Sequence, residues 1–270
     1  MFVGRIRTSC FNLTAVIAFN IAVFTIVLIY VFSCRTPRNT TLGINLRLFG
    51  MFMSALLSTL FLKSAGFITE KELTPSIEYS IPLFLETMVI PLGITLMLFT
   101  GPLADRVLSR TLFTAPTHYQ IKEKFRSYII GPIIEEYLYR FLLTSLLIKC
   151  YSVESTILIT AILFSLSHTH HHYMALLRSG SCDWSELGVH SLSTFLFGLY
   201  SGLLFVRTKS IVCLSLIHAF CNWMSVVRYS RLWTKIYKLF ATLIGLISGF
   251  TLLYIFTKDY TQYRALIYYG

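Results

Sequence analysis

The sequence predicts an all-α, polytopic membrane protein with about eight transmembrane helices. Of its 270 residues, 55% are hydrophobic and 13% are charged. The charged share is about half of the roughly 25% that is usual in a soluble domain. Apolar runs of about 20 residues, the length that a spanning helix needs, also recur along the whole chain. Short polar clusters interrupt three of these runs.

The apolar runs define eight expected spans. The first is too long for the apolar core of a secretory signal and lacks a small-residue cleavage site after it, so we expect a signal anchor. No internal repeat and no Gly/Ser linker divides the chain, which favours one membrane-embedded domain over 1–270. The expected spans are 12–33, 45–62, 80–103, 127–149, 155–175, 189–206, 210–227 and 237–257.

The Lys and Arg residues lie mostly between these spans and give the chain a net charge of +11. About 13 of them fall on one side of the membrane and about 9 on the other. By the positive-inside rule the richer side faces the cytosol, which places both termini in the lumen. This basic face is expected to attract anionic membrane lipid. No basic element with interleaved aromatic residues stands apart from the membrane, so nothing indicates a nucleic-acid partner.

Six cysteines are scattered through the sequence without CxxC spacing. Such scatter favours neither a disulfide framework nor a zinc ribbon. We therefore expect thiols that pack as small core residues. The six are Cys10, Cys34, Cys150, Cys182, Cys213 and Cys221.

The three polar clusters are GPIIEEYLYR at 131–140, FSLSH with THHHY at 164–173, and HAFCN at 218–222. Such side chains are costly in a membrane unless they pair with one another or line a wet cavity. The expected topology puts all three at similar depth, near the cytosolic ends of their spans. We therefore expect the helices to enclose an intramembrane catalytic cavity, built by a core at about 125–225.

Helical spacing separates the roles of two neighbouring carboxylates. Glu136 and Arg140 are four residues apart, so they share a helix face and can form an ion pair. Glu135 points about 100° away and is the candidate general base. An apolar surround favours the neutral form of a carboxyl group, which suits a group that must take up a proton. His168 is the candidate imidazole that helps to hold the water.

The third cluster supplies hydrogen-bond donors. His218 and Asn222 are four residues apart, so both can aim a donor at an oxyanion that develops on a carbonyl group. A base, a held water and two such donors describe amide hydrolysis without a covalent intermediate. The roles of other polar residues are left open. Glu86 is either a functional residue or a group that is hydrogen-bonded or snorkels toward the membrane interface. His170, His171 and His172 either join His168 or shape the mouth of the cavity.

The clusters form an ordered set of motifs that resembles the CAAX protease and bacteriocin-processing family of membrane proteases. They match EExxxR (Glu135, Glu136, Arg140), FxxxH (Phe164, His168) and HxxxN (His218, Asn222). The run at 168–171 is similar to the HxHH run of the eukaryotic type II CAAX prenyl endopeptidase branch. Further positions that fit this branch are Phe197, Gly198, Tyr200, Phe205, Arg207 and Thr208.

This resemblance implies an eight-helix, glutamate-dependent protease in the endoplasmic reticulum membrane, with its active site open to the cytosol. It implies removal of the last three residues from prenylated CaaX proteins such as Ras-like small GTPases, without a cofactor or a metal. Ser165 and Ser167 depart from the family, which often has smaller residues there, but they still suit helix packing. The implied roles are Glu135 as base, His168 on the water, His218 and Asn222 as oxyanion hole, and Glu136 with Arg140 in support.

Three alternatives remain from the residues themselves. One glutamate and two histidines are also a usual zinc ligand set, which would make a membrane metalloprotease, although HExxH is absent. Cys221 beside His218 could be a nucleophile, but apolar surroundings disfavour its thiolate. A transporter or scaffold could keep the polar cluster as a conduit, but it lacks the paired broken helices and the repeat that are usual in transporters.

Overall fold

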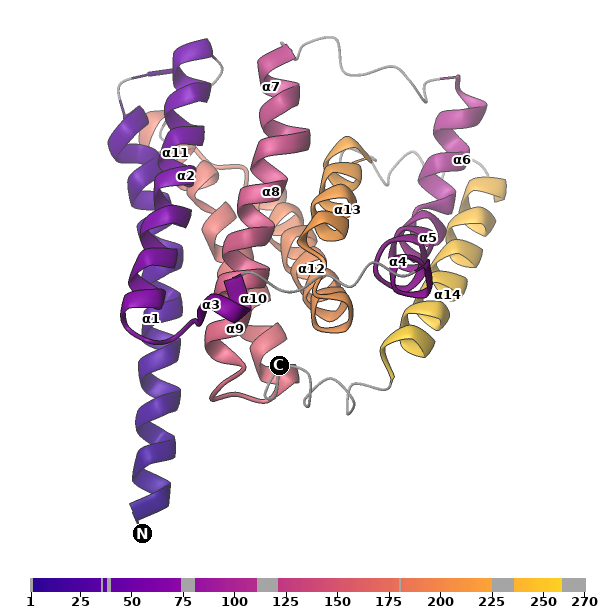
Figure 1. Ribbon diagram of the computed structural model, residues 1–270. Helices are drawn as coiled ribbons and strands as arrows, with labels where there is room; N and C mark the ends of the chain where they lie inside the picture. Colours follow the sequence, from indigo (N-terminus) through magenta and orange to yellow (C-terminus); the bar gives the residue numbers. More distant parts are fainter. Residues whose placement is uncertain are drawn as a thin grey trace. The chain divides into compact units, whose positions relative to one another are not determined.

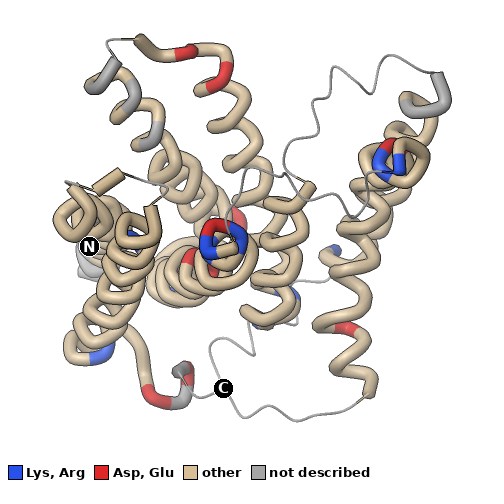
Figure 2. Tube along the Cα trace, turned by 90° about the horizontal axis from the view of Figure 1, so that it is seen from above, with Lys and Arg blue, Asp and Glu red and all other residues tan. Residues whose placement is uncertain are grey.

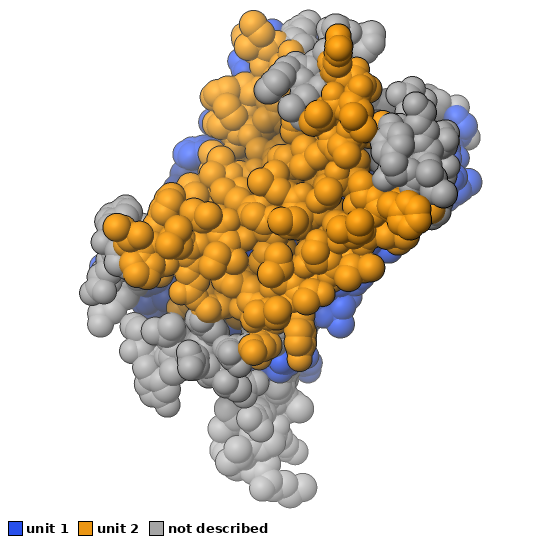
Figure 3. Space-filling model, turned by 90° about the vertical axis from the view of Figure 1, so that its right-hand side faces the viewer, with its two compact units in different colours: residues 1–76, 134–205 blue, residues 77–133, 206–270 orange. Residues whose placement is uncertain are grey.

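The structure, a computed structural model, describes residues 2–34, 36–37, 40–73, 81–110, 121–179, 181–224 and 236–258 (Figure 1). Every regular element in these ranges is a helix, which confirms the all-α class. The chain forms two compact units, each made from two separate stretches of sequence (Figure 3). Unit 1 comprises Met1–Ser76 and Ile134–Phe205, and unit 2 comprises Ile77–Ile133 and Val206–Gly270. The expectation of one domain over 1–270 stays a prediction.

Five helical segments in the described ranges are long and apolar enough to cross a membrane, which confirms a polytopic membrane protein. They match the first, second, third, sixth and eighth expected spans. The other three expected spans carry the polar clusters, and the count of eight stays a prediction. Figure 2 shows how few Lys, Arg, Asp and Glu residues the helices carry. The five segments are Asn12–Ser33, Thr41–Ser64, Ile81–Leu98, Trp184–Thr208 and Leu239–Thr257.

Unit 1 joins the N-terminal helices to the helices of the first two motifs. In it, α1 and α2 lie side by side, and α1 also contacts α9 and α10 (Figure 1). A Cβ atom on Gly50 would lie 2.9 Å from the Leu28 carbonyl oxygen, so glycine allows the backbones of α1 and α2 to approach closely. Its helices are α1 (Phe2–Ser33), α2 (Thr41–Ser64), α3 (Glu70–Leu73), η3 (Tyr137–Leu142), α9 (Leu143–Leu147), α10 (Val153–His168), α11 (His170–Ser179) and α12 (Trp184–Thr208), whose last residues belong to unit 2.

In unit 2, α14 packs against α5 and α6. A Cβ atom on Gly245 would lie 2.5 Å from the Met97 carbonyl oxygen, so this contact requires glycine. Glu86 forms an ion pair with Arg207, which favours the paired alternative for this carboxylate over a functional one. Its helices are α4 (Ile81–Phe84), η1 (Leu85–Val89), α5 (Ile90–Leu98), α6 (Thr100–Leu108), α7 (Ile121–Phe125), η2 (Arg126–Ile130), α8 (Gly131–Glu136), which continues into unit 1, α13 (Ile211–Met224) and α14 (Ile236–Thr257).

The expectation that all six cysteines are thiols is wrong for two of them. Cys10 on α1 and Cys150, just after α9, form a disulfide across a sequence separation of 140 residues. The cause is the packing of α1 against α9, which brings together two positions that no local spacing connects. The other four are thiols, as expected, but of these only Cys213 is buried in the core, Cys34 is exposed, and Cys182 and Cys221 are part-exposed.

The fourth expected span is less regular than predicted. Helical structure runs from Ile121 to Leu147, and the π-helical turns η2 and η3 interrupt it. At the end of η2, the Gly131 N–H donates to the Arg126 carbonyl oxygen. A Cβ atom on Gly131 would lie 2.7 Å from this oxygen, so the turn requires glycine. Such π turns are frequent at functional sites, and this one precedes Glu135.

Candidate active site

The Glu136–Arg140 ion pair lies in the interior of unit 1. Glu136 Oε2 is 3.3 Å from Arg140 Nε, and both side chains are fully buried, which confirms the predicted pairing. Arg140 Nε also donates to Ser201 Oγ at 2.6 Å, and its guanidinium lies 4.7 Å from the Phe164 ring centroid. Removal of one member of a buried ion pair costs about 3–5 kcal/mol, because the other charge stays buried without compensation. The pair therefore suits a supporting role.

Small residues on α12 bring Ser201 to this ion pair. A Cβ atom on Gly198 would lie 2.9 Å from Ala161 Cα, and one on Gly202 would lie 3.0 Å from Ile157 Cγ2. Glycine at both positions therefore lets α12 approach α10 closely, as small residues do between membrane helices. Gly198 is one of the positions that fit the type II branch. The close approach of α12 to α10 explains physically why glycine stands there.

Glu135 and His168 meet in unit 1. Glu135 Oε2 lies 3.6 Å from His168 Nε2, and the two side chains are 24% and 21% exposed. This distance is longer than a hydrogen bond, and both side chains are part-exposed. A water molecule could lie about 2.8 Å from both atoms and donate one hydrogen to each. The structure thus brings together the two residues that the sequence predicts to act on a water.

Phe164 orients the His168 ring. His168 Nδ1 lies 2.8 Å from the Phe164 carbonyl oxygen. Because a carbonyl oxygen only accepts, Nδ1 carries the proton, and Nε2 of the neutral imidazole is an acceptor on the side of Glu135. The Phe164 ring also packs on His168, with the ring centroids 4.4 Å apart. The FxxxH motif therefore sets both the position and the tautomer of this histidine.

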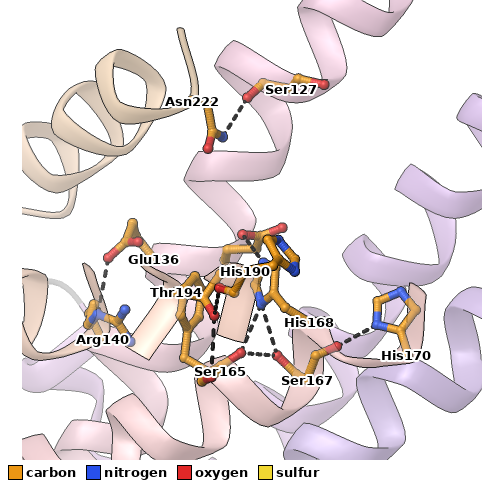
Figure 4. Close-up of polar contacts among 12 residues, drawn as sticks. Ser127, Glu136, Arg140, Ser165, Ser167, His168, His170, His190, Thr194 and Asn222 are labelled. Atoms are coloured by element: carbon orange, nitrogen blue, oxygen red, sulfur yellow. Dashed lines mark hydrogen bonds and ion pairs between the residues drawn. The ribbon is translucent and has the colours of Figure 1, made fainter. Parts of the chain in front are cut away.

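The fifth expected span is wrong in its C-terminal part, because α10 ends at His168 and a new helix begins at His170. Thr169 Oγ1 donates to the Leu166 carbonyl oxygen at 2.7 Å. His170 Nδ1 bonds the Ser167 carbonyl oxygen (Figure 4). The Leu166 carbonyl oxygen also accepts from the Thr169 N–H at 3.1 Å, so side chains supplement the backbone donors at the helix end. The end of α10 leaves His168 in the last turn.

His218 and Asn222 lie one helical turn apart on α13, in unit 2. His218 is buried and Asn222 is part-exposed. Asn222 Nδ2 donates to the Ser127 carbonyl oxygen of η2 at 2.9 Å (Figure 4). An amide nitrogen carries two hydrogens, and this bond takes one of them. Glu135 and His168 belong to unit 1, so the convergence of the three clusters stays a prediction.

The zinc alternative requires one glutamate and two histidines as ligands. Glu135 and His168 approach each other in unit 1, and His218 lies in unit 2. Within the ranges that the structure describes, no three His, Cys, Asp or Glu side chains are grouped as metal ligands. The response of the activity to chelation therefore distinguishes metal chemistry from glutamate chemistry.

His190 on α12 is a residue of this site that the sequence motifs missed. Its ring centroid lies 6.0 Å from that of His168 and 5.4 Å from that of His172. Figure 4 shows His190 beside His168. His190 is not three or four residues away from any motif residue, because it belongs to another helix. A histidine near the start of an apolar span was the available signal.

The comparison with protein families identifies the same part of the chain. The family model described as type II CAAX prenyl endopeptidase Rce1-like matches residues 120–224. This range contains all three polar clusters, and it nearly coincides with the core expected at 125–225. No solved structure matches the chain significantly.

Curated relatives align with the same region. CAAX prenyl protease 2 of Caenorhabditis elegans is 30% identical over 147 residues, which are 49% of this chain and 55% of the relative. Human CAAX prenyl protease 2 is 26% identical over 152 residues, 50% of this chain and 46% of the relative. The Arabidopsis thaliana protein of that name is 30% identical over 110 residues, 38% of this chain and 34% of the relative. The chain thus spans about a third to a half of these relatives. Residues 120–224 are therefore similar to the Rce1-like family of type II CAAX prenyl endopeptidases.

Proposed function

We propose that this chain is an intramembrane endopeptidase that removes the C-terminal aaX tripeptide from prenylated CaaX proteins. The observation that carries the proposal is the contact between Glu135 and His168 inside the family-matched segment 120–224. The relatives of this segment are named CAAX prenyl protease 2, which supports the substrate class. Neither a metal nor another cofactor is part of the proposal.

Each side chain has one task in the proposed reaction. Glu135 takes a proton from the water that His168 helps to hold, and the water oxygen attacks the carbonyl carbon of the prenylated cysteine. His218 and Asn222 donate hydrogen bonds to the oxyanion that forms. When the intermediate collapses, the C–N bond breaks and the proton passes from Glu135 to the amine of the tripeptide. The products are a prenylated cysteine carboxylate and a free tripeptide.

The membrane setting fits a lipid-modified substrate. A prenyl chain holds the C-terminal tail of a protein such as a Ras-like GTPase at the bilayer surface. A protease embedded in the bilayer can take the peptide without extracting the lipid into water. We assign the endoplasmic reticulum membrane and a cytosolic opening of the site, where such tails are presented.

The Cys10–Cys150 disulfide supports this orientation. In the expected topology, both cysteines lie on the side opposite to the basic loops, which is the lumen. Disulfides persist in the oxidising lumen of the endoplasmic reticulum and are rare in the cytosol. Charge distribution and disulfide position therefore point to the same side by independent physical reasons.

The orientation predicts which thiols a membrane-impermeant maleimide reaches in sealed microsomes. In a Cys10→Ser variant, Cys150 should react only after the membrane is permeabilised, as read by mass-tag gel shift. Cys34, which is exposed and follows the first span, is the control and should react in sealed vesicles. Reaction of Cys150 in sealed vesicles of the variant would reverse the assigned orientation.

The proposed activity predicts release of an aaX tripeptide from a farnesylated C-a-a-X peptide by the purified protein, with a rate that chelation leaves unchanged. Cys221→Ser should keep most of this activity, because no thiol takes part. Mass spectrometry of the released tripeptide, before and after prolonged chelation, provides the measurement. Activity lost on chelation and restored by zinc alone would favour the metalloprotease, and an inactive Cys221→Ser variant would favour the thiol. No release at all would contradict the proposed function.

A further inference from the structure

We infer that His190 and His172 form a binding site for the C-terminal carboxylate of the substrate, beside the Glu135–His168 pair. The inference rests on the proposed function, because that reaction takes a peptide that ends in a free carboxylate three residues after the bond to be cut. Four observations carry it: the tethering of His190, the geometry of the two rings, their exposure and their distance from the water position. All of these residues belong to unit 1.

Two hydrogen bonds between α10 and α12 fix the backbone beside His190. Ser165 Oγ donates to the Ser191 carbonyl oxygen at 2.7 Å, and Thr194 Oγ1 donates to Ser165 Oγ at 3.3 Å (Figure 4). They join the turn of α12 that begins at His190 to the turn of α10 that ends at His168. The placement of His190 against His168 is therefore built into the helix packing.

The two rings have the chemistry and exposure that a carboxylate site requires. Their centroids are 5.4 Å apart and their planes are inclined by 53°, so both can turn a nitrogen toward one ligand. Both residues are part-exposed, while Nδ1 of His190 lies in the interior. Imidazole N–H groups donate to carboxylates, and bonds to a charged acceptor are the stronger ones. In an apolar surround, such a pair would compensate for the lost hydration of the terminal carboxylate.

The two rings lie within reach of a leaving tripeptide. An extended chain advances about 3.3–3.6 Å per residue, so the terminal carboxylate lies at most about 10 Å from the attacked carbonyl carbon. The ring centroid of His190 is 6.0 Å from that of His168, which is placed on the water, and 5.4 Å from that of His172. His170 differs, because its ring packs edge-on against Tyr30 at 5.5 Å and Nδ1 bonds a backbone carbonyl. It therefore serves as the matched control.

The test compares two farnesylated C-a-a-X peptides that differ only in a free carboxylate or a carboxamide at the C-terminus. The parent should cleave the carboxylate peptide with a kcat/KM about tenfold or more above that of the amide. His190→Ala and His172→Ala should lose most of this preference through KM, with the amide peptide little affected. His190→Gln, which keeps an N–H donor, should restore part of it. His170→Ala should keep the full preference.

A binding measurement separates this inference from the proposed function. In a Glu135→Gln background, the Kd ratio of the two peptides in nanodiscs reports carboxylate recognition without turnover. Equal binding of both peptides, or an unchanged preference in the His190 and His172 variants, would overturn the carboxylate site. A loss of kcat on both peptides alike would make His190 a positioning residue for His168 and would also overturn it. If the parent does not cleave either peptide but still binds the carboxylate peptide more tightly than the amide peptide, the proposed function alone would be overturned.

Discussion

The Glu135→Ala variant is expected to release tripeptide from a farnesylated C-a-a-X peptide about 10² to 10⁴ times more slowly than the parent, the contribution typical of a general base. Glu135 is part-exposed and 3.6 Å from His168 Nε2, so alanine removes the proton acceptor without emptying a buried site. The yield of folded protein and the binding of the peptide should therefore change little. The measurement is kcat of purified variants, normalised to folded protein.

Glu136→Ala is the matched control for this result. It removes a neighbouring carboxylate of the same type, but that one is fully buried against Arg140. We expect a loss of folded protein, because an arginine then stays buried without its charge partner. The folded fraction should keep more activity than Glu135→Ala does. Release by Glu135→Ala at more than about a tenth of the parent rate would be too small a loss for a general base.

The Asn222→Asp variant is expected to lose about 10² to 10³ in kcat with KM nearly unchanged, since an oxyanion donor acts mainly in the transition state. The carboxylate keeps the shape of the amide but repels the developing oxyanion. In the structure, Asn222 also donates to the Ser127 carbonyl oxygen, so the variant loses this bond too. Loss of a part-buried hydrogen bond of this kind costs about 0.5–1.5 kcal/mol, which lowers the folded fraction but not kcat per folded molecule.

His218→Ala supplies the second half of this test. His218 is buried one turn before Asn222, and its loss should lower kcat by a similar factor. Asn222→Ala, which removes the donor without adding a charge, should fall between the parent and Asn222→Asp. Weaker peptide binding with an unchanged kcat in these variants would make the pair a recognition element and refute the oxyanion role.

Features that depend on neighbours along the chain were predictable from the sequence. Hydropathy alone located the five long apolar helices, because the membrane solvates each spanning helix by itself. The i, i+4 spacing of Glu136 and Arg140 predicted their ion pair, because helix geometry sets that contact. The order of the three motifs located the functional core to within a few residues of the family-matched range 120–224.

The irregular parts of the motif helices were not predictable in this way. The π turn before Gly131 and the end of α10 at His168 both lie inside apolar runs that hydropathy reads as continuous. They depend on which carbonyl groups find alternative hydrogen-bond donors, as the Leu166 carbonyl does at Thr169. This competition depends on the positions of individual donor and acceptor atoms. Hydropathy averaged over a window of residues does not detect it.

Contacts between distant segments were decided by the tertiary structure alone. The Cys10–Cys150 disulfide, the Glu86–Arg207 ion pair and the placement of His190 against His168 join residues on different helices. Each contact depends on which helices pack together and on the rotation of each helix about its axis. No periodic pattern in a single sequence specifies the partner or the rotation of a helix. The sequence by itself therefore determined the class of protein and the chemical groups of the site. Helix packing decided which of those groups meet, because it selects partners by shape across the membrane interior.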